Sequence, residues 1–191
     1  SRGLGDVYKR QDLESADIIK SQEIKDLATA IGSLPGDTDI SNLRYGKICI
    51  LADADSDGLH IATLLCALFL RHYKNLVTSG KIFVSMPPLY RIDAAKEVFY
   101  ALDENEKESI VKKIKKQNSK IKIDIQRFKG LGEMNPYQLR ETVMKPESRR
   151  LVQLTLSSSD NANSVFDLLL SKKRAPDRKE WLEKKGNLAE I

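Results

Sequence analysis

The sequence contains few of the residues that mark secreted, zinc-binding or membrane-spanning proteins. It has two cysteines, Cys49 and Cys66, and both lie in apolar stretches. Their spacing suits neither a zinc site nor a disulfide framework, so we interpret them as reduced core residues of a cytosolic protein. No signal peptide is visible, and the longest apolar run, residues 64–70, is too short to span a bilayer. We therefore expect a cytoplasmic protein without a membrane partner.

The sequence also lacks internal repeats and low-complexity tracts. With 41% hydrophobic and 31% charged residues, it is typical of a folded chain, and 191 residues suffice for one domain with or without an appendage. The net charge is +5, and its excess lies in the C-terminal third, where 13 Lys and Arg stand against 9 Asp and Glu from Arg127 onward. This distribution favours a polyanionic partner.

The stretch with the clearest chemistry follows an apolar run, residues 48–52, that we expect to be a buried strand. Three carboxylates come next at alternate positions, Asp53, Asp55 and Asp57, and then Gly58. On an extended backbone, residues i and i+2 point the same way, so Asp53 and Asp55 can converge where a cation offsets their repulsion. Oxygen ligands favour Mg²⁺ or Ca²⁺ over zinc. The pattern predicts a metal site at the carboxyl end of a strand.

Two other interpretations of this acidic turn stay open at this point. One is a solvated turn that binds nothing. The other is a calcium loop, because Asp-x-Asp-x-Asp-Gly opens the EF-hand pattern. That pattern needs a bidentate Glu at its twelfth position, which here is Leu64, and it needs a helix where a strand precedes Asp53. The choice of a Mg²⁺ site that acts on phosphates therefore depends on the other motifs.

Hydrophobic periodicity predicts the elements around the acidic turn. Residues 12–31 follow helical spacing in part, with Gly32 as the stop. A helix over residues 60–77 and a second buried strand over 82–86 complete a strand–helix–strand unit. Such a unit predicts a parallel sheet.

The second half of the chain alternates short strands and helices. We expect a hairpin of strands 89–92 and 98–102, then a charged helix from a capping box at Asp103 and Glu106 to about Lys116. The remaining predicted elements are a strand through Ile121, Ile123 and Ile125, a helix over 136–144, a strand over 151–156, and helices over 165–170 and 177–185.

A glycine-rich motif lies between two of these elements. Gly130 and Gly132 stand beside Arg127 and Lys129, and the absence of side chains would let the backbone approach a phosphate closely. The alternative is a plain turn into a helix that Asn135 caps.

Three motifs in this order resemble the B subunits of bacterial type IIA DNA topoisomerases. They are Ala52-Asp53-Ala54-Asp55-Ser56-Asp57-Gly58-Leu59-His60-Ile61, Pro87-Pro88-Leu89-Tyr90-Arg91 and Arg127-Phe128-Lys129-Gly130-Leu131-Gly132-Glu133-Met134-Asn135-Pro136. The tail, from Arg149-Arg150-Leu151 through Trp181-Leu182 to Ala189-Glu190-Ile191, is more similar to the topoisomerase IV branch than to the gyrase branch. The resemblance covers about residue 12 to the C-terminus. Residues 1–11 do not match, and we expect them to be disordered or foreign to the domain.

The resemblance implies an α/β fold of the Toprim type. Residues 12–126 would form a small parallel sheet flanked by helices, without the N-terminal part of the domain and with a hairpin and helix insertion near residues 93–120. Residues 127–191 would form a C-terminal α+β tail that carries the basic glycine-rich loop and helices.

The resemblance also implies roles for individual residues. Asp53 and Asp55 would hold Mg²⁺ and take part in catalysis, with Asp57 supporting the turn or binding the metal through water. The resemblance would place His60, Arg127 and Lys129 near the DNA backbone, and we also predict that Arg149, Arg178 and Lys179 bind DNA. In the family, the metal stabilises charge on the phosphate where DNA is cut and resealed.

The partners implied are DNA, an A subunit that carries the nucleophilic tyrosine, and a second B subunit. The complex would be cytoplasmic and nucleoid-associated, and ATP would bind outside this chain. The family's upstream Glu-Gly-Asp-Ser motif, a further metal ligand and general acid, is absent, because Glu14 and Glu23 have the wrong neighbours. We therefore expect a C-terminal segment that alone neither hydrolyses ATP nor cleaves DNA and binds Mg²⁺ weakly.

Three alternative functions follow from the same residues. The first is a gyrase B subunit. The second is a nucleic-acid or partner-binding module with a vestigial metal loop. The third is a phosphatase-like hydrolase with Asp53 as nucleophile, which the residues Asp57-Gly58-Leu59-His60 fit poorly.

Overall fold

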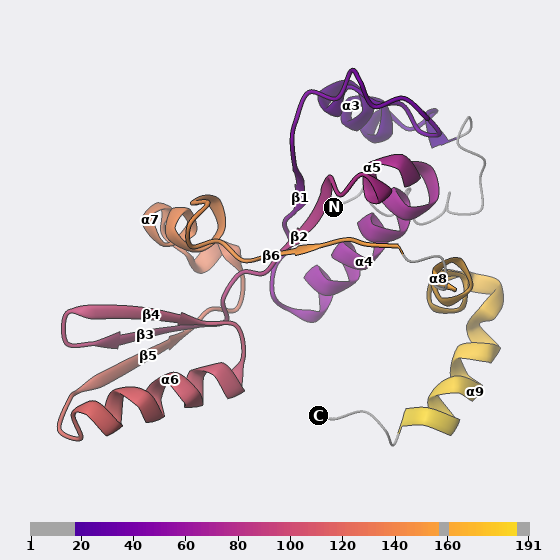
Figure 1. The fold of residues 1–191 in the computed structure, drawn as a ribbon. Helices are drawn as coiled ribbons and strands as arrows, with labels where there is room; N and C mark the ends of the chain where they lie inside the picture. Colours follow the sequence, from indigo (N-terminus) through magenta and orange to yellow (C-terminus); the bar gives the residue numbers. More distant parts are fainter. Residues whose placement is uncertain (1–17, 157–160, 187–191) are drawn as a thin grey trace. The chain divides into compact units, whose positions relative to one another are not determined.

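The computed structural model (Figure 1) describes residues 18–156 and 161–186. These residues divide into two compact units. Unit 1 contains residues 18–46, Leu64–Lys81, 154–156 and 161–186. Unit 2 contains Lys47–Thr63 and Ile82–Gln153. Each unit thus combines segments that are distant in sequence, whereas we expected one boundary between residues 126 and 127. The predicted disordered stretch, residues 1–11, lies outside the described residues.

Unit 1 begins with helix α3 (Gln22–Ile31), which buries Ile24, Ala28 and Ile31 along one face. The helix ends as predicted at Gly32, whose φ of 77° is left-handed and whose amide donates to the Ala28 carbonyl at 2.9 Å. A Cβ at position 32 would lie 2.4 Å from the Asn42 carbonyl oxygen. The end of this helix therefore needs glycine both for the left-handed backbone conformation and because a side chain would overlap Asn42.

The long helix predicted over residues 60–77 is two helices, α4 (Ser56–His72) and α5 (Lys74–Thr78). Tyr73 separates them with φ −132° and ψ 41°, and its side chain is buried, which raises the pKa of its phenol to about 12. The carbonyl of His72, at the end of α4, accepts from the Gly36 amide at 2.7 Å. The helix breaks where the preceding loop supplies this hydrogen bond, which apolar spacing does not reveal.

Two small clusters hold the second half of α4, from Leu64 onward, within unit 1. Leu68 packs with Ile24 of α3 and Ile18, and Leu64 and Ala67 pack with Leu170 of α8 (Ala162–Leu170). Helix α9 (Ala175–Lys185) follows α8. Both tail helices were predicted, and each begins two or three residues earlier than we expected.

Unit 2 contains a three-stranded sheet in the order β1-β2-β6. Strand β1 (Ile48–Ile50) is parallel to β2 (Ile82–Ser85), as predicted, with Cys49 opposite Phe83. Strand β6 (Leu151–Gln153) is antiparallel to β2. The sheet is therefore mixed rather than parallel throughout, because the strand that we assigned to the tail is hydrogen-bonded to its central strand.

A second, antiparallel sheet in unit 2 has the order β4-β3-β5. Strands β3 (Tyr90–Ala94) and β4 (Glu97–Ala101) form the predicted hairpin, with Ala95 at φ 54° in its two-residue turn. Strand β5 (Ile123–Arg127) pairs with the other edge of β3. Helix α6 (Glu104–Gln117) covers this sheet, where Ile92, Ala94, Ala101 and Ile114 form a buried cluster (Figure 1).

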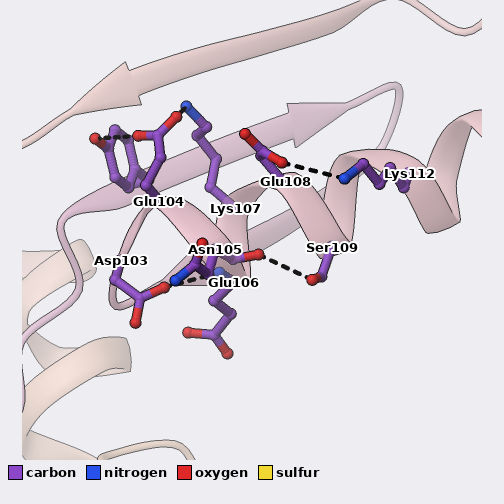
Figure 2. A network of polar contacts seen from close by, with 9 residues as sticks. Asp103, Glu104, Asn105, Glu106, Lys107, Glu108, Ser109 and Lys112 are labelled. Atoms are coloured by element: carbon purple, nitrogen blue, oxygen red, sulfur yellow. Dashed lines mark hydrogen bonds and ion pairs between the residues drawn. The ribbon is translucent and has the colours of Figure 1, made fainter. Parts of the chain in front are cut away.

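Polar contacts fix the start of α6 (Figure 2). The Asp103 side chain accepts from the Glu106 amide at 2.8 Å, as the capping box predicts, but Glu106 accepts from the Leu102 amide instead of from Asp103. The hydroxyl of Tyr90 donates to Glu104 at 2.7 Å. Glu106 also forms a two-point ion pair with Arg150, just before β6, at 2.7 and 2.9 Å. This ion pair ties α6 to the segment that enters the first sheet.

The last helical segment of unit 2 is α7 (Pro136–Leu139), which continues as a π-helical turn, Arg140–Met144. Asn135 caps it in a complete capping box with Gln138, as the sequence predicts. None of the helices in the described ranges is long and apolar enough to cross a membrane.

We predict that Gly32→Ala lowers the free energy of unfolding by at least about 1–2 kcal/mol, because a left-handed alanine adds strain and its Cβ would overlap the Asn42 carbonyl. Gly46→Ala is the matched control, since a Cβ there meets nothing within 4 Å. Urea denaturation of both variants measures the difference. Equal stability of Gly32→Ala and Gly46→Ala would contradict the geometry described for the end of α3.

We predict that Glu106→Gln lowers stability by about 0.5–1 kcal/mol at pH 7. Hydrogen bonding from Arg150 lowers the pKa of the Glu106 carboxyl, so its stabilising effect is present above the unfolded pKa of about 4.3 and is lost as the pH falls below it. Denaturation at pH 7 and pH 3 should therefore show a deficit that shrinks in acid. Glu108→Gln, which removes an exposed ion pair to Lys112, serves as the control and should cost less. A Glu106→Gln deficit of the same size at both pH values would rule out the ion pair as its cause.

Candidate functional site

The acidic turn connects β1 to α4 by a helix cap. Strand β1 ends at Ile50 and α4 begins at Ser56, four residues before the predicted start. The Asp55 carboxylate accepts from the Gly58 amide at 2.7 Å, and its carbonyl accepts from the Leu59 amide at 3.0 Å. Asp55 is therefore the N-cap of α4. Our premise of an extended backbone through Asp55 was wrong, because the chain is already turning into the helix.

The Asp53 side chain makes a different contact, to the glycine-rich motif. Its Oδ1 accepts a hydrogen bond from the backbone amide of Leu131 at 2.7 Å, across 78 residues of sequence. All of Asp53, Asp55 and Asp57 are exposed. The contact joins two of the motifs that the sequence analysis singled out.

Two glycines lie against Asp53. A Cβ at Gly58 would lie 2.1 Å from the Asp53 carbonyl oxygen, and a Cβ at Gly130 would lie 3.0 Å from its Oδ1. By contrast, a Cβ at Gly132 would meet nothing within 4 Å. We expected Gly130 to make space for a phosphate, but the group that occupies its open side is the Asp53 carboxylate.

The glycine loop, residues 129–133, is closed by its own hydrogen bonds. The Glu133 carboxylate accepts from the Lys129 amide at 2.8 Å, and the Glu133 amide donates to the Gly130 carbonyl at 3.2 Å. Phe128 enters the loop from β5, is 1% exposed, and donates through its amide to the Leu89 carbonyl at 2.8 Å. Met134 leaves the loop and is also buried. The loop is thus fixed at both ends.

The third motif meets the other two in a small apolar pocket. Its lining comes from the acidic turn, from the segment after β2 and from the glycine loop with its flanks: Ala54, Pro87, Pro88, Phe128, Gly130, Leu131 and Met134. All these residues belong to unit 2. The fold therefore brings the three motifs together in one place.

The carboxylates of the acidic turn do not form a ready-made three-ligand cluster. In the described part of the chain, no three His, Cys, Asp or Glu side chains are grouped as a metal site would require. Helix α4 begins at Ser56 and includes Asp57 in its first turn, which explains why the three predicted ligands do not converge. Asp53 and Asp55 each use one oxygen for a backbone amide, and within the described residues the second oxygen of each has no partner. Two exposed carboxylate oxygens fit Mg²⁺, which is usually bound by one or two carboxylates and several waters.

Four of the predicted DNA contacts lie in unit 2. His60 is exposed on the first half of α4, and Arg127 and Lys129 are exposed at the end of β5 and in the glycine loop. Arg149 is half-buried, and its side chain makes no hydrogen bond or ion pair with the described residues. Its neighbour Arg150 is committed to Glu106. Their assignment to DNA stays a prediction.

The other two predicted contacts lie in unit 1, on α9. The Arg178 guanidinium donates to the carbonyls of Leu168 and Ser171 at 3.0 and 2.6 Å. Arg178 therefore satisfies carbonyls at the C-terminal end of α8, a structural role that we did not expect. Lys179 is exposed, and its Nζ lies 3.8 Å from Oε1 of Glu183.

The sequence analysis missed Gly58 and Leu131. Gly58 was interpreted as the end of the acidic motif, although a glycine in a first helical turn signals close approach of another backbone group. Leu131 contributes only its amide, which no side-chain pattern announces.

The chain is similar in sequence to known DNA topoisomerase subunits. The family described as the carboxyl terminus of the DNA gyrase B subunit matches residues 120–183. The chain is 57% identical over 187 residues to the B subunit of DNA topoisomerase 4 from Pseudomonas aeruginosa, covering 98% of this chain and 30% of that protein. It is 41% identical over 168 residues to the B subunit of DNA gyrase from Thermotoga maritima, covering 87% of this chain and 26% of that protein. The chain thus spans less than a third of the length of these relatives.

A solved structure supports the fold. The Plasmodium falciparum topoisomerase II DNA-binding, cleavage and re-ligation domain matches with a TM-score of 0.68 at 22% identity, over 90% of this chain and 23% of that one. The predicted α/β class, with small sheets flanked by helices, is confirmed. Over nearly all of its length, the chain is homologous to a segment of bacterial DNA topoisomerase B subunits, and it is more similar to the topoisomerase 4 relative than to the gyrase relative.

Proposed function

We propose that this chain is the Toprim part of a topoisomerase IV B subunit and supplies the acidic metal-binding group for DNA cleavage and resealing. The observation that carries the proposal is the hydrogen bond from Leu131 to Asp53, because it unites the acidic turn and the basic glycine loop at one place. Carboxylates beside a basic loop are what a phosphate-directed cation site needs.

Asp53 and Asp55 would hold Mg²⁺ through the oxygens that their backbone contacts leave open. When bound, the ion would stabilise negative charge on the phosphate where the strand is cut and resealed. Asp57, in the first turn of α4, would act through water. The backbone contacts keep both carboxylates in place, so that no reorganisation is needed when charge develops.

Exposed and half-buried cations of unit 2 would position the DNA. Lys129 is part of the glycine loop and Arg127 precedes it, so both can neutralise phosphates without reading bases. His60 and Arg149 would add contacts from α4 and from the segment before β6. We leave Arg178 out of this surface because its guanidinium is used within unit 1.

The intact enzyme would need partners that this chain does not contain. An A subunit would provide the nucleophilic tyrosine, a second B subunit would complete a heterotetramer, and ATP would bind elsewhere in the B subunit. The complex would pass one duplex through a double-strand break in the bacterial cytoplasm, at the nucleoid. By itself the chain would bind Mg²⁺ weakly and cleave nothing.

We predict that Asp53→Asn and Asp55→Asn in the intact B subunit reduce Mg²⁺-dependent cleavage of a supercoiled plasmid about 100-fold or more. The assay uses the variant protein reconstituted with its A subunit. Asparagine keeps an oxygen that can accept from the Leu131 and Gly58 amides, so the loss would report the missing charge rather than a broken fold.

Asp124→Asn is the matched control, since Asp124 is an exposed carboxylate on β5, and it should cleave like wild type. If both acidic-turn variants cleave as well as the control, the turn is only structural. The chain would then be a binding module with a vestigial metal loop.

We also predict that the reconstituted enzyme relaxes and decatenates DNA without introducing supercoils. The higher identity to the topoisomerase 4 relative than to the gyrase relative supports this choice. Gel electrophoresis of relaxed and of linked plasmid circles with ATP distinguishes the two enzymes. Negative supercoiling of the relaxed plasmid would assign the chain to gyrase instead.

A further inference from the structure

We infer that the glycine loop, residues 129–133, is a positioning element for the Asp53 carboxylate: it holds Oδ1 and leaves Oδ2 for a divalent cation. The inference rests on the proposed function, because it takes Asp53 as a metal ligand. Beyond that function, we infer that Gly130 and Leu131, whose side chains cannot bind a metal, determine how tightly the site binds the cation.

The loop holds Asp53 by one directed contact. The Leu131 amide donates to Oδ1 at 2.7 Å, a distance typical of a hydrogen bond to a charged carboxylate. Within the described residues, no hydrogen bond or ion pair reaches Oδ2. One oxygen is thus satisfied by the protein, and the other can bind a cation.

Gly130 makes this contact possible. A Cβ added at Gly130 would lie 3.0 Å from Oδ1 and 3.2 Å from Cγ of Asp53, so an alanine there would shift the carboxylate by a few tenths of an ångström. The backbone of Gly130 has φ −168°, an extended conformation that any residue adopts. Glycine therefore matters at this position for the space it leaves beside the carboxylate, and its backbone angle does not require it. Gly132, two residues on, has open space at its Cβ position and provides a natural control.

The main chain of Asp53 is held from the other side. Gly58, in the first turn of α4, lies so close that its missing Cβ would be 2.1 Å from the Asp53 carbonyl oxygen. Gly58 in turn donates to Asp55 at 2.7 Å. The backbone of Asp53 is packed against α4 while its side chain is held by the loop, so few rotamers remain for it.

The loop can act as a positioning element because it is itself rigid. Its ends are anchored by the buried residues Phe128 and Met134, and Glu133 closes it through the Lys129 amide at 2.8 Å. Outer contacts that orient a metal ligand typically change metal affinity by about 10–100-fold when they are removed. We expect metal affinity to fall by about 10–100-fold when a side chain fills the space at Gly130 or when the Leu131 amide is removed.

The test uses the full 191-residue chain and Mn²⁺ alone as the probe, with free Mn²⁺ measured by electron paramagnetic resonance. Gly130→Ala fills the space beside the carboxylate, and Gly132→Ala is its control. Leu131→Pro is an independent variant that removes the donor on the main chain. Proline is tolerated there because residue 131 is the first position of a 3-10 turn and residue 130 is extended. Asp53→Asn tests the ligand itself.

The expected result is that Gly130→Ala and Leu131→Pro bind Mn²⁺ about tenfold or more weakly than wild type, while Gly132→Ala binds like wild type. A second readout is the nuclear magnetic resonance signal of the Leu131 amide during titration with Mg²⁺. Because a cation on Oδ2 draws charge from the carboxylate, this signal should shift in wild type and Gly132→Ala but not in Asp53→Asn. The shift would show that the cation binds to the same carboxylate that the Leu131 amide holds.

The outcomes separate the two proposals. If Asp53→Asn weakens binding but Gly130→Ala and Leu131→Pro do not, Asp53 is a ligand and the positioning role is wrong. If Asp53→Asn binds Mn²⁺ like wild type, or wild type binds none, the ligand role fails and the positioning role fails with it. Should both loop variants unfold, the Mg²⁺-dependent shift of Leu131 in wild type decides, and its absence overturns the inference.

Discussion

The hydrogen bond between the Leu131 amide and the Asp53 carboxylate is the contact on which the rest of the site depends. It joins the end of a parallel strand to a loop that follows an antiparallel strand, 78 residues later. Without it, the acidic turn would be an exposed helix cap, and the basic loop would be an ordinary connection. With it, the Asp53 carboxylate and the glycine loop that carries Lys129 share one region of unit 2. The chemistry that we propose therefore comes from a tertiary contact and not from either motif alone.

The second sheet of unit 2 positions the glycine loop for this contact. Strand β5 is paired to β3 up to Arg127, and the next residue, Phe128, donates to the Leu89 carbonyl. The sheet thus determines where the glycine loop begins. Helix α6 covers the sheet, and its ion pair from Glu106 to Arg150 connects it to the entrance of β6. Elements that carry no candidate ligand still decide where the Asp53 partner lies.

Local patterns predicted the parts of the fold that depend on neighbours in sequence. Apolar runs located β1 and β2, the capping residues Asp103 and Asn135 located the starts of α6 and α7, and Gly32 located the end of α3. The same patterns failed where a distant group decides. The break at Tyr73 coincides with a hydrogen bond from Gly36 to the end of α4.

The same limit applied to the site: residues with a local pattern were predicted, and contacts with distant groups were not. The aspartates were found because acidic residues after a buried strand are visible in sequence, but Asp55 was given an extended conformation where it caps a helix. A cap and a metal ligand use the same residue type, and the structure shows that Asp55 caps the helix with one carboxylate oxygen. Gly130 was expected to face a phosphate and faces Asp53 instead, since sequence cannot show which group approaches a glycine. Arg178 was chosen for its charge, and its role within α8 and α9 depends on packing between helices.

The most direct test of a metal site at Asp53 is anomalous diffraction from crystals of the intact B subunit with its A subunit, DNA and Mn²⁺. We expect an anomalous peak within direct bonding distance of the carboxylates of Asp53 and Asp55, with the Leu131 amide still donating to Asp53. A well-ordered acidic turn without a peak, or a peak bound only to other residues, would contradict it.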